Sequence, residues 1–273
     1  GIELISGYTK EDFSANFILW RELVHPEDKE KVSEKLEQLF LGKSISNLQH
    51  RIIDSHEEVR WVSLNANVLY DAHQDIQKIV GTVTDISEQK QLEDKLRHLA
   101  YYDNLTNLPN RLLLHNHLKR AKARAKRNNH NLTILFMDLD GFKQVNDTLG
   151  HDVGDLLLKE VASRLENCVR EEDLISRIGG DEFIIVLEET ENEDVRKIAE
   201  RIVSAISERY ELNGNETEVT PSIGISVYPE HGEEIEVLLK NADKAMYVAK
   251  NNGKAQYVFY EPTLQNSQLK KSI

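Results

Sequence analysis

The sequence predicts two domains: an α+β domain with an antiparallel sheet, joined by a helix to an α/β domain with a central sheet flanked by helices. Three observations predict this. Period-two hydrophobicity runs through residues 48–84, a short helical seam lies in 88–101, and helices alternate with buried strands from residue 102. The 273 residues, 40% of them apolar, are sufficient for two cores.

Composition narrows the class of partner. The formal net charge is −13, which excludes sequence-independent nucleic-acid binding because that needs a basic surface, while a bound metal ion still permits a nucleotide substrate. Cys168 is the single cysteine, so no internal disulfide or thiolate metal cluster can form, and a reducing, cytoplasmic setting is predicted. No apolar run reaches membrane-span length in this fragment. The chain opens with Gly1 and is interpreted as part of a longer protein, which leaves a membrane anchor upstream open.

The first domain is predicted to begin with helical and loop segments. A helix is expected from Pro26, with Val32, Leu36, Leu39 and Phe40 on one face. Three antiparallel strands are expected at 48–53, 59–70 and 76–84, separated by polar turns. Four histidines of this half show no ligand spacing and are expected at the surface: His25, His50, His56 and His73.

Helices followed by a three-stranded meander resemble a PAS domain with its C-terminal PAC half. The matching segments are 23–28, 60–62 and 85–87, and the two strands that normally open a PAS fold have no counterpart here. The resemblance implies an incomplete sensor domain at 1–87; an unrelated α+β domain is the alternative. Its ligand is not readable, although a cysteinyl-flavin is disfavoured because the only cysteine lies elsewhere.

A linker helix is predicted at 88–101. Leu92, Leu96 and Leu99 are spaced as a short a/d seam, which favours pairing with the same helix of a second copy. The PAS domain and this helix together predict a homodimer. A single exposed amphipathic helix explains the same spacing, and two heptads do not decide between them.

The second domain is predicted from its hydrophobic periodicity. Helices are expected at about 108–127, 153–169, 193–208 and 233–250, and strands at 132–139, 174–178, 183–187, 219–227 and 257–260. The strands 174–178 and 183–187 flank two glycines and form a hairpin. Leu114, Leu118, Ala121 and Ala125 are expected to form the buried face of the first helix.

Acids stand at the ends of two apolar strands. The strand 132–137 ends in Asp138, and the hairpin carries Asp181 and Glu182 at its tip. A buried acid is costly unless a cation or hydrogen-bond donors meet it. If the two strands are neighbours, Asp138 and Asp181 can share magnesium, which prefers oxygen ligands. Taken alone, each acid is better explained as a capping or turn residue; the two together, each after a buried strand, favour a metal site.

Five segments in order resemble GGDEF-domain diguanylate cyclases. They are 103–111, 138–155, 177–183 (RIGGDEF), 222–226 and 242–250, and the resemblance covers roughly 100–262. It implies a GGDEF domain at 102–262 with a palm-like sheet. It also implies that a homodimer condenses two GTP molecules into cyclic di-GMP and two pyrophosphates, because a two-fold product needs two facing sites.

The resemblance also implies roles by position. Mg²⁺, with Mn²⁺ as a substitute, would be held by Asp138, the carbonyl of Leu139, and Asp181. Catalysis would use Asp181 as base, with Lys143 and Glu182. Substrate would be bound by Asn146, His151, Asp155, Lys250, Lys254, Gly179 and Gly180. Local sequence explains several of these equally well as helix caps, turns or a C-terminal cation.

Two further features qualify the resemblance. The family usually has Gly-Arg-Asn where this chain has Gly253-Lys254-Ala255, so the bidentate grip of arginine on phosphate is lost. Arg170 and Asp173 resemble the family's inhibitory site, which implies cyclic di-GMP as an allosteric ligand. The tail 263–273 resembles the lead-in to an EAL domain. Three alternatives therefore stay open: a GTP-binding regulatory module of a GGDEF-EAL phosphodiesterase, a pure cyclic di-GMP receptor, and a different nucleotide cyclase.

Overall fold

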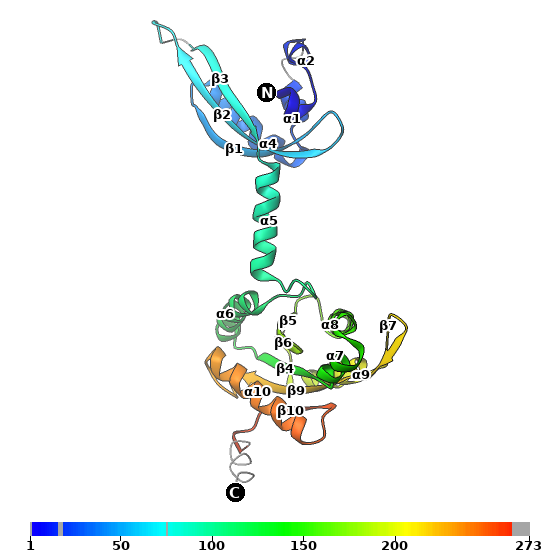
Figure 1. Ribbon diagram of the computed structural model, residues 1–273. Helices are drawn as coiled ribbons and strands as arrows, with labels where there is room; N and C mark the ends of the chain where they lie inside the picture. The colour runs from blue at the N-terminus through cyan, green and yellow to red at the C-terminus, as the bar shows by residue number, and fades with distance from the viewer. Residues whose placement is uncertain (1, 16–18, 75, 264–273) are drawn as a thin grey trace. The chain divides into compact units, whose positions relative to one another are not determined.

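The structure is a computed structural model that describes residues 2–15, 19–74 and 76–263, in two compact units that divide between residues 97 and 98 (Figure 1). The tail 264–273, predicted to lead into an EAL domain, lies outside the described residues. Within the part of the chain that is described, no helix is both long and apolar enough to cross a membrane.

The first unit has short helices followed by three long strands. Its elements are α1 (Ile2–Ser6), α2 (Lys10–Ala15), α3 (Leu19–Leu23), the 3-10 turn η1 (Pro26–Asp28), α4 (Lys29–Phe40), β1 (Ile45–Ile53), β2 (Val59–Tyr70) and β3 (Ile76–Asp85). The strands form one antiparallel sheet in the order β1-β2-β3, which confirms the predicted α+β class. Val32 and Leu39 of α4 pack on this sheet, whereas Phe40, predicted on the same face, is 56% exposed.

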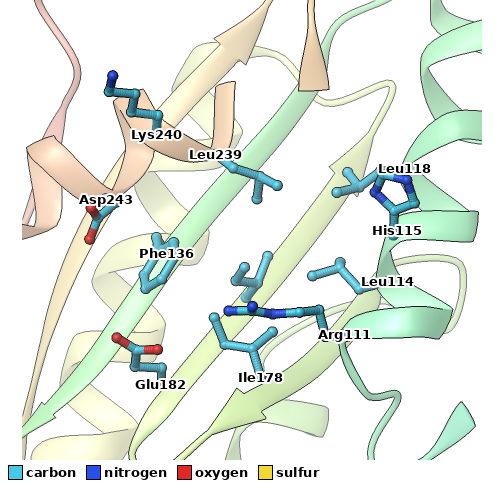
Figure 2. Close-up of a pocket in the computed structure, with 11 residues that line it drawn as sticks. Arg111, Leu114, His115, Leu118, Phe136, Ile178, Glu182, Leu239, Lys240 and Asp243 are labelled. Carbon is cyan, nitrogen blue, oxygen red and sulfur yellow. The ribbon is translucent and has the colours of Figure 1, made fainter. Parts of the chain in front are cut away.

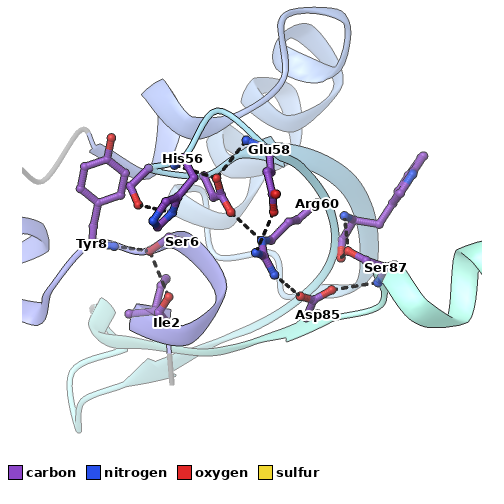
Figure 3. A network of polar contacts seen from close by, with 11 residues as sticks. Ile2, Ser6, Tyr8, His56, Glu58, Arg60, Asp85 and Ser87 are labelled. Carbon is purple, nitrogen blue, oxygen red and sulfur yellow. Dashed lines mark hydrogen bonds and ion pairs between the residues drawn. The ribbon is translucent and has the colours of Figure 1, made fainter.

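A polar network ties the β1–β2 turn to the end of β3 (Figure 3). The buried carboxylate of Asp54 accepts a hydrogen bond from Nε of Arg60 at 2.7 Å, and Nη1 of Arg60 lies 3.6 Å from Asp85. Asp85 in turn accepts from the backbone N–H of Ser87 at 2.8 Å, and Ser87 begins α5 (Ser87–Tyr101). The start of the linker helix is therefore fixed to the sheet of the first unit. Leu92, Leu96 and Leu99 are each more than half exposed along α5.

One histidine expected at the surface is buried. His50 in β1 is 0% exposed; its Nδ1 lies 3.2 Å from the carbonyl oxygen of Leu48, and its Nε2 has no hydrogen-bond partner. Its ring meets the edge of Trp20 at 5.8 Å between centroids. Period-two alternation places residue 50 on the inner face with Leu48 and Ile52, and this overrides the polar character of the side chain.

We expect the first unit to lose stability as the pH falls below about 6.5. Burial lowers the pKa of His50, opposed by the Leu48 carbonyl and Asp28 and assisted by Lys31. The unfolded chain therefore binds the proton more readily, so the stabilisation is complete above the ordinary histidine pKa and is lost as the pH drops through and below it. Both tryptophans, Trp20 and Trp61, belong to this unit, so tryptophan fluorescence during thermal unfolding reports on it.

The matched control is His73, which is exposed in the β2–β3 turn. His50→Leu should flatten the dependence of the unfolding midpoint on pH, and His73→Gln should leave it as in the parent chain. Each kcal/mol lost lowers the midpoint by about 4–8 °C in a domain of this size. An unchanged pH slope in His50→Leu would contradict the assignment.

The second unit is a five-stranded mixed sheet with helices on both faces. Its elements are α6 (Arg111–Asn128), β4 (Leu132–Asp140), α7 (Phe142–Leu149), α8 (His151–Glu166), β5 (Leu174–Gly179), β6 (Glu182–Glu188), α9 (Asn192–Ser207), β7 (Tyr210–Leu212), β8 (Asn215–Thr217), β9 (Thr220–Tyr228), α10 (Ile235–Asn251) and β10 (Gln256–Phe259). The strand order is β10-β9-β4-β6-β5, with β10 parallel to β9 and the other pairs antiparallel. The predicted α/β class and the hairpin are confirmed.

The central strand β4 is buried along its whole length because both faces of the sheet are covered. Leu135, Met137 and Leu139 point into a core shared with α8 and α9. Ile134 and Phe136 point into a second core shared with α6 and α10, which includes the predicted apolar face of α6. Alternation along a strand thus divides one apolar run between two cores.

Two elements differ from prediction. The helix predicted at 153–169 is α8, which begins at His151 and ends at Glu166, and the preceding helix α7 was not predicted; Gly150 at φ +88° separates the two. Gly150 is also the N-cap of α8, and Asp152 lies in the first turn of this helix, where an acid is favourable. The short hairpin β7–β8 was not predicted, since two three-residue strands carry too little periodicity to be read from sequence.

Candidate active site

The predicted acids meet at the edge where β4 ends beside the β5–β6 hairpin. In the β4–β6 register Asp138 lies opposite Glu182, and the backbone N–H of Leu139 donates to the carbonyl of Asp181 at 3.3 Å. The turn needs two glycines, because Gly179 and Gly180 have φ of +148° and +54°. A Cβ on either would meet no atom within 4 Å, so the tip faces open space.

This edge carries more negative charge than its own cations balance. Asp138 is 8% exposed, and its carboxylate is 2.6 Å from Nζ of Lys250. Burial and the neighbouring charge of Asp138 raise the pKa of Asp181. Burial, followed by the charges of Asp138, Asp181 and Asp243, also raises the pKa of Glu182. A further cation at this edge would relieve the repulsion between these carboxylates.

The side chains at this edge fit a magnesium ion shared with a bound substrate better than they fit a metal ion held by protein ligands alone. Among the described residues no three His, Cys, Asp or Glu side chains converge as a metal-binding group. Magnesium is commonly held by one or two carboxylates together with substrate phosphates and water. Asp138, Asp181 and the main-chain oxygen of Leu139 would supply such a partial ligand set.

The neighbouring acid Asp140 has a different environment. Its Oδ2 accepts hydrogen bonds from Oγ1 of Thr220 at 3.0 Å and from Oγ of Ser222 at 2.8 Å. These contacts fasten the ends of β4 and β9 together. Asp138 and Asp140 stand two positions apart in the chain, yet one faces Lys250 and the other is satisfied by hydroxyls.

The predicted guanine-recognition residues lie on α7 and α8, directly after β4. Asn146 packs against Gly154, and a Cβ at residue 154 would lie only 1.9 Å from Oδ1 of Asn146. His151 and Asp155 are exposed, one helical turn apart on α8, and Lys143 is exposed on α7. The absence of a side chain at residue 154 therefore creates the space that Asn146 occupies.

The two predicted phosphate-binding lysines differ in their contacts. Lys250 lies in the last turn of α10 and reaches Asp138. Lys254 is exposed, and within the described residues its side chain makes no hydrogen bond or ion pair. Lys254 and Ala255 have φ of +64° and +47°, a region that asparagine tolerates better than alanine. The departure from the usual Gly-Arg-Asn therefore affects the backbone conformation at residue 255 as well as the geometry of the phosphate contact at residue 254.

Two residues of the resembling segments have a role that the sequence did not reveal. Arg177 donates from Nε and Nη2 to the carbonyl of Gly180 at 3.0 and 2.8 Å, and from Nη1 to Asp103 at 2.8 Å. Asp103 also accepts from the backbone and hydroxyl of Thr106. Arg177 thereby fixes the hairpin turn that precedes Asp181. Their presence in the 103–111 and 177–183 segments was the only sequence signal.

The predicted inhibitory pair lies apart from this edge. Arg170 and Asp173 line a pocket of about 410 Å³ with Leu108 and Pro109. The Arg170 side chain is 58% exposed, and the backbone N–H of Arg170 donates to Asp173 at 3.0 Å. Pro109 connects this pocket to the hairpin, because its carbonyl accepts from the backbone N–H of Arg177 at 3.0 Å.

The mixed sheet, its two helical layers and the acidic edge beside a Gly-Gly hairpin define an α/β domain of the GGDEF class. Residues 100–256 match the family described as diguanylate cyclase, GGDEF domain, and residues 1–83 match the PAS fold. The chain belongs to the GGDEF family, with a PAS fold in its first unit.

Curated relatives share this similarity over part of their length. The chain is 47% identical over 170 residues to the bifunctional diguanylate cyclase/cyclic di-GMP phosphodiesterase MucR of Pseudomonas aeruginosa, covering 62% of this chain and 25% of MucR. It is 40% identical over 173 residues to the diguanylate cyclase TpbB of the same species, covering 62% of this chain and 40% of TpbB. The chain is 32% identical over 244 residues to the signaling protein YkoW of Bacillus subtilis, covering 88% of this chain and 30% of YkoW. The chain therefore spans less than half the length of these relatives.

Solved structures resemble the second unit. The GGDEF domain of TpbB from Pseudomonas aeruginosa has a TM-score of 0.61 and 36% identity, and the match covers 62% of this chain and 99% of that one. The coiled coil and GGDEF domain of DgcB from Caulobacter crescentus, in complex with c-di-GMP, has a TM-score of 0.59 and 26% identity, covering 64% of this chain and 93% of that one.

Proposed function

We propose that the second unit is a diguanylate cyclase that condenses two GTP molecules into cyclic di-GMP and two pyrophosphates. The observation that carries the proposal is the convergence of Asp138, Asp181 and Glu182 on one strand edge, with Lys250 beside them. Membership of the GGDEF family supports the same chemistry.

Each residue at this edge has a chemical task in the proposal. Asp138, Asp181 and the Leu139 carbonyl would hold magnesium, and the ion would neutralise charge on the triphosphate. Lys250 is placed to pair with phosphate once Asp138 is engaged by the metal. Lys143, from α7, stabilises charge on the reacting phosphate. Glu182 adds negative charge beside the metal ligands.

In the reaction, the 3′-hydroxyl of one GTP attacks the α-phosphorus of the other. The new O3′–Pα bond forms as the bond from Pα to the β-phosphate oxygen breaks, and pyrophosphate leaves. Asp181 accepts the proton of the hydroxyl. The same step in the opposite direction closes the ring. Asn146 and Asp155 recognise the guanine edge, assisted by His151, while Lys254 and the open Gly179–Gly180 turn accommodate phosphate.

The decisive experiment is incubation of the chain with GTP and Mg²⁺, followed by mass spectrometry. Cyclic di-GMP and pyrophosphate in a molar ratio of one to two support the proposal, and product should disappear when EDTA is added. GTP binding without any turnover would contradict it. That outcome would instead support a regulatory GTP-binding module, a role favoured by relatives named cyclic di-GMP phosphodiesterases, PdeR and NbdA, which are 34% and 38% identical to the matched parts of this chain.

Two facing sites require two copies, and the exposed leucines of α5 support a paired linker helix. Leu92, Leu96 and Leu99 present an apolar seam at 52%, 64% and 54% exposure. Pairing α5 with its counterpart would bury this seam and bring two cyclase units together. The PAS unit would then set how often the two meet, with a signal that the sequence does not reveal.

We expect Leu92→Glu combined with Leu96→Glu to weaken dimerisation. Four glutamates would face one another across the paired helices, at a cost of several kcal/mol in lost apolar burial and added repulsion. Sedimentation at several concentrations should show a shift to monomer, with cyclase activity lowered in parallel. A matched control is Glu88→Gln with Asp94→Asn, which alters charge on the same helix and leaves the seam intact. Unchanged mass and turnover in the leucine variant would contradict pairing through α5.

Product inhibition completes the proposal. Cyclic di-GMP would bind at the Arg170–Asp173 pocket, with arginine contacting guanine and phosphate. Pro109 lines this pocket, and its carbonyl accepts a hydrogen bond from the backbone N–H of Arg177. A ligand in the pocket would therefore contact a residue that is hydrogen-bonded to the strand before the hairpin turn.

A further inference from the structure

The last residue of β4 is a buried acid that has no task in the proposed reaction. Asp140 is 9% exposed, and its Oδ2 accepts hydrogen bonds from Oγ1 of Thr220 at 3.0 Å and from Oγ of Ser222 at 2.8 Å. Both hydroxyls come from β9, where Thr220 lies opposite Asp140 and Ser222 lies opposite Asp138. We call these three hydrogen-bonded side chains, Asp140, Thr220 and Ser222, the hydroxyl clamp. The clamp joins the two strands where the proposed metal ligands stand.

The hydroxyl clamp lies on the same face of the sheet as Asp138. Alternation along β4 places Phe136, Asp138 and Asp140 on one side. Figure 2 shows that side of the sheet, with Phe136 on β4 and Asp243 on the covering helix α10. Ser222 is fully buried and lies opposite Asp138 in the register, yet its hydroxyl donates to Asp140. The oxygens of Asp138 therefore receive no hydrogen bond from this hydroxyl and stay available to a metal ion.

Stability alone does not explain an acid at this position. Among the described residues no lysine, arginine or histidine side chain contacts Asp140, so hydroxyl donors compensate its burial without a cation. Burying an acid in this way is unfavourable, and apolar side chains of similar volume often stabilise a fold as well or better. The acid at residue 140 therefore indicates a role in the site beside it.

Leu139, between the two acids, supplies the proposed main-chain ligand. Its side chain is buried in the core on the other face of the sheet, and its backbone N–H donates to the carbonyl of Asp181 at 3.3 Å. Its carbonyl shares a rigid peptide plane with the N–H of Asp140, so the orientation of Asp140 sets the direction of that oxygen. Beyond Asp140 the strand pairing ends and the chain turns at Gly141, which has φ +86°. The hydroxyl clamp therefore fixes the peptide that carries the Leu139 oxygen.

We propose that Asp140 is a positioning residue for the metal ion: the hydroxyl clamp holds the Leu139 oxygen and the Asp138 carboxylate in the arrangement that binds Mg²⁺. The inference rests on the metal site of the proposed function and adds to it side chains that touch neither metal nor nucleotide. Asp140 acts through the geometry of its hydrogen bonds rather than through its charge. Replacing residues that orient metal ligands commonly weakens metal binding by about 10–100-fold.

Metal binding is measured without turnover by using a GTP analogue with a methylene group between the α- and β-phosphorus atoms, which cannot release pyrophosphate. The unfolding midpoint, followed by circular dichroism at a constant excess of this analogue, is recorded against free Mg²⁺ concentration. Thr220→Val combined with Ser222→Ala removes both donors and should raise the half-saturating Mg²⁺ concentration by about tenfold or more. With GTP, kcat should recover at high Mg²⁺. A merely structural role would lower the midpoint and leave the half-saturating concentration unchanged.

Three variants serve as controls. Thr220→Ser keeps a hydroxyl and should retain the parental metal affinity. Ser226→Ala removes another buried hydroxyl of β9, which donates to the Leu238 carbonyl at 2.9 Å, and should also leave the affinity unchanged. Asp140→Asn keeps an oxygen acceptor for both hydroxyls and should weaken binding less than the double hydroxyl variant does.

Two results would overturn the inference. One is parental Mg²⁺ affinity in the double hydroxyl variant, and the other is a larger loss of affinity in Asp140→Asn, which would show that Asp140 acts through its charge. A parent chain that binds Mg²⁺ with the analogue but forms no cyclic di-GMP from GTP contradicts the proposed function alone. In that case a weakened metal affinity in the double hydroxyl variant still supports the hydroxyl clamp.

Discussion

Asp138→Asn is expected to reduce cyclic di-GMP formation by about a thousandfold or more, the scale of losing electrostatic stabilisation of a reacting phosphate. Asp138 is the buried acid nearest to Lys250, and asparagine removes the charge that holds metal while keeping the size of the side chain. Initial rates measured by quantifying product at saturating GTP and Mg²⁺ check this expectation.

A matched control is Asp147→Asn, an exposed acid on α7. This variant carries the same charge change near the same segment, and its rate should stay within about twofold of the parent. Fold integrity of both variants is compared by circular dichroism. If Asp138→Asn retains folded structure and near-parental turnover, metal binding at this edge is not what drives the reaction.

The second large effect concerns substrate recognition. Gly154→Ala should raise the KM for GTP by about five- to 150-fold, the consequence of losing about one to three kcal/mol of guanine hydrogen bonding. The new methyl group would overlap Oδ1 of Asn146, whose flexible side chain must rotate away. Alanine favours helix over glycine, so α8 should not unfold. Steady-state kinetics with GTP measure the change.

A double-mutant cycle separates this mechanism from general damage. Once Asn146 is replaced by alanine, nothing remains for the methyl group of Gly154→Ala to displace. The double variant should therefore have nearly the KM of Asn146→Ala alone. Additive effects of the two substitutions would show that residue 154 acts by a route other than Asn146.

Several features were accessible from sequence because they depend on local periodicity. The three strands of the first unit, the hairpin around Gly179 and Gly180, and the buried face of α6 follow from patterns within a few residues. The acids at strand ends were visible for the same reason. The helix at 142–149 was not predicted because it is only eight residues long and lies between two glycines, so its apolar periodicity is too short to stand out.

Other features needed the assembled sheet. His50 has a polar side chain, yet its position in β1 places that side chain on the buried face of the sheet. Asp138 and Asp140 look equivalent in the sequence. The pairing of β4 with its neighbours and the approach of α10 give them different partners: Asp138 contacts Lys250, and Asp140 accepts hydrogen bonds from hydroxyl groups. Arg177 likewise gains its role from Asp103, far away in sequence.

The sequence by itself determined the fold class of both halves, their order, and the residue types available for metal and nucleotide chemistry, because hydrophobic period and turn residues act over short distances. The tertiary structure decided which acids face one another and which glycine makes room for Asn146. Strand register and helix packing bring these groups together from distant parts of the chain, and no local pattern encodes that meeting.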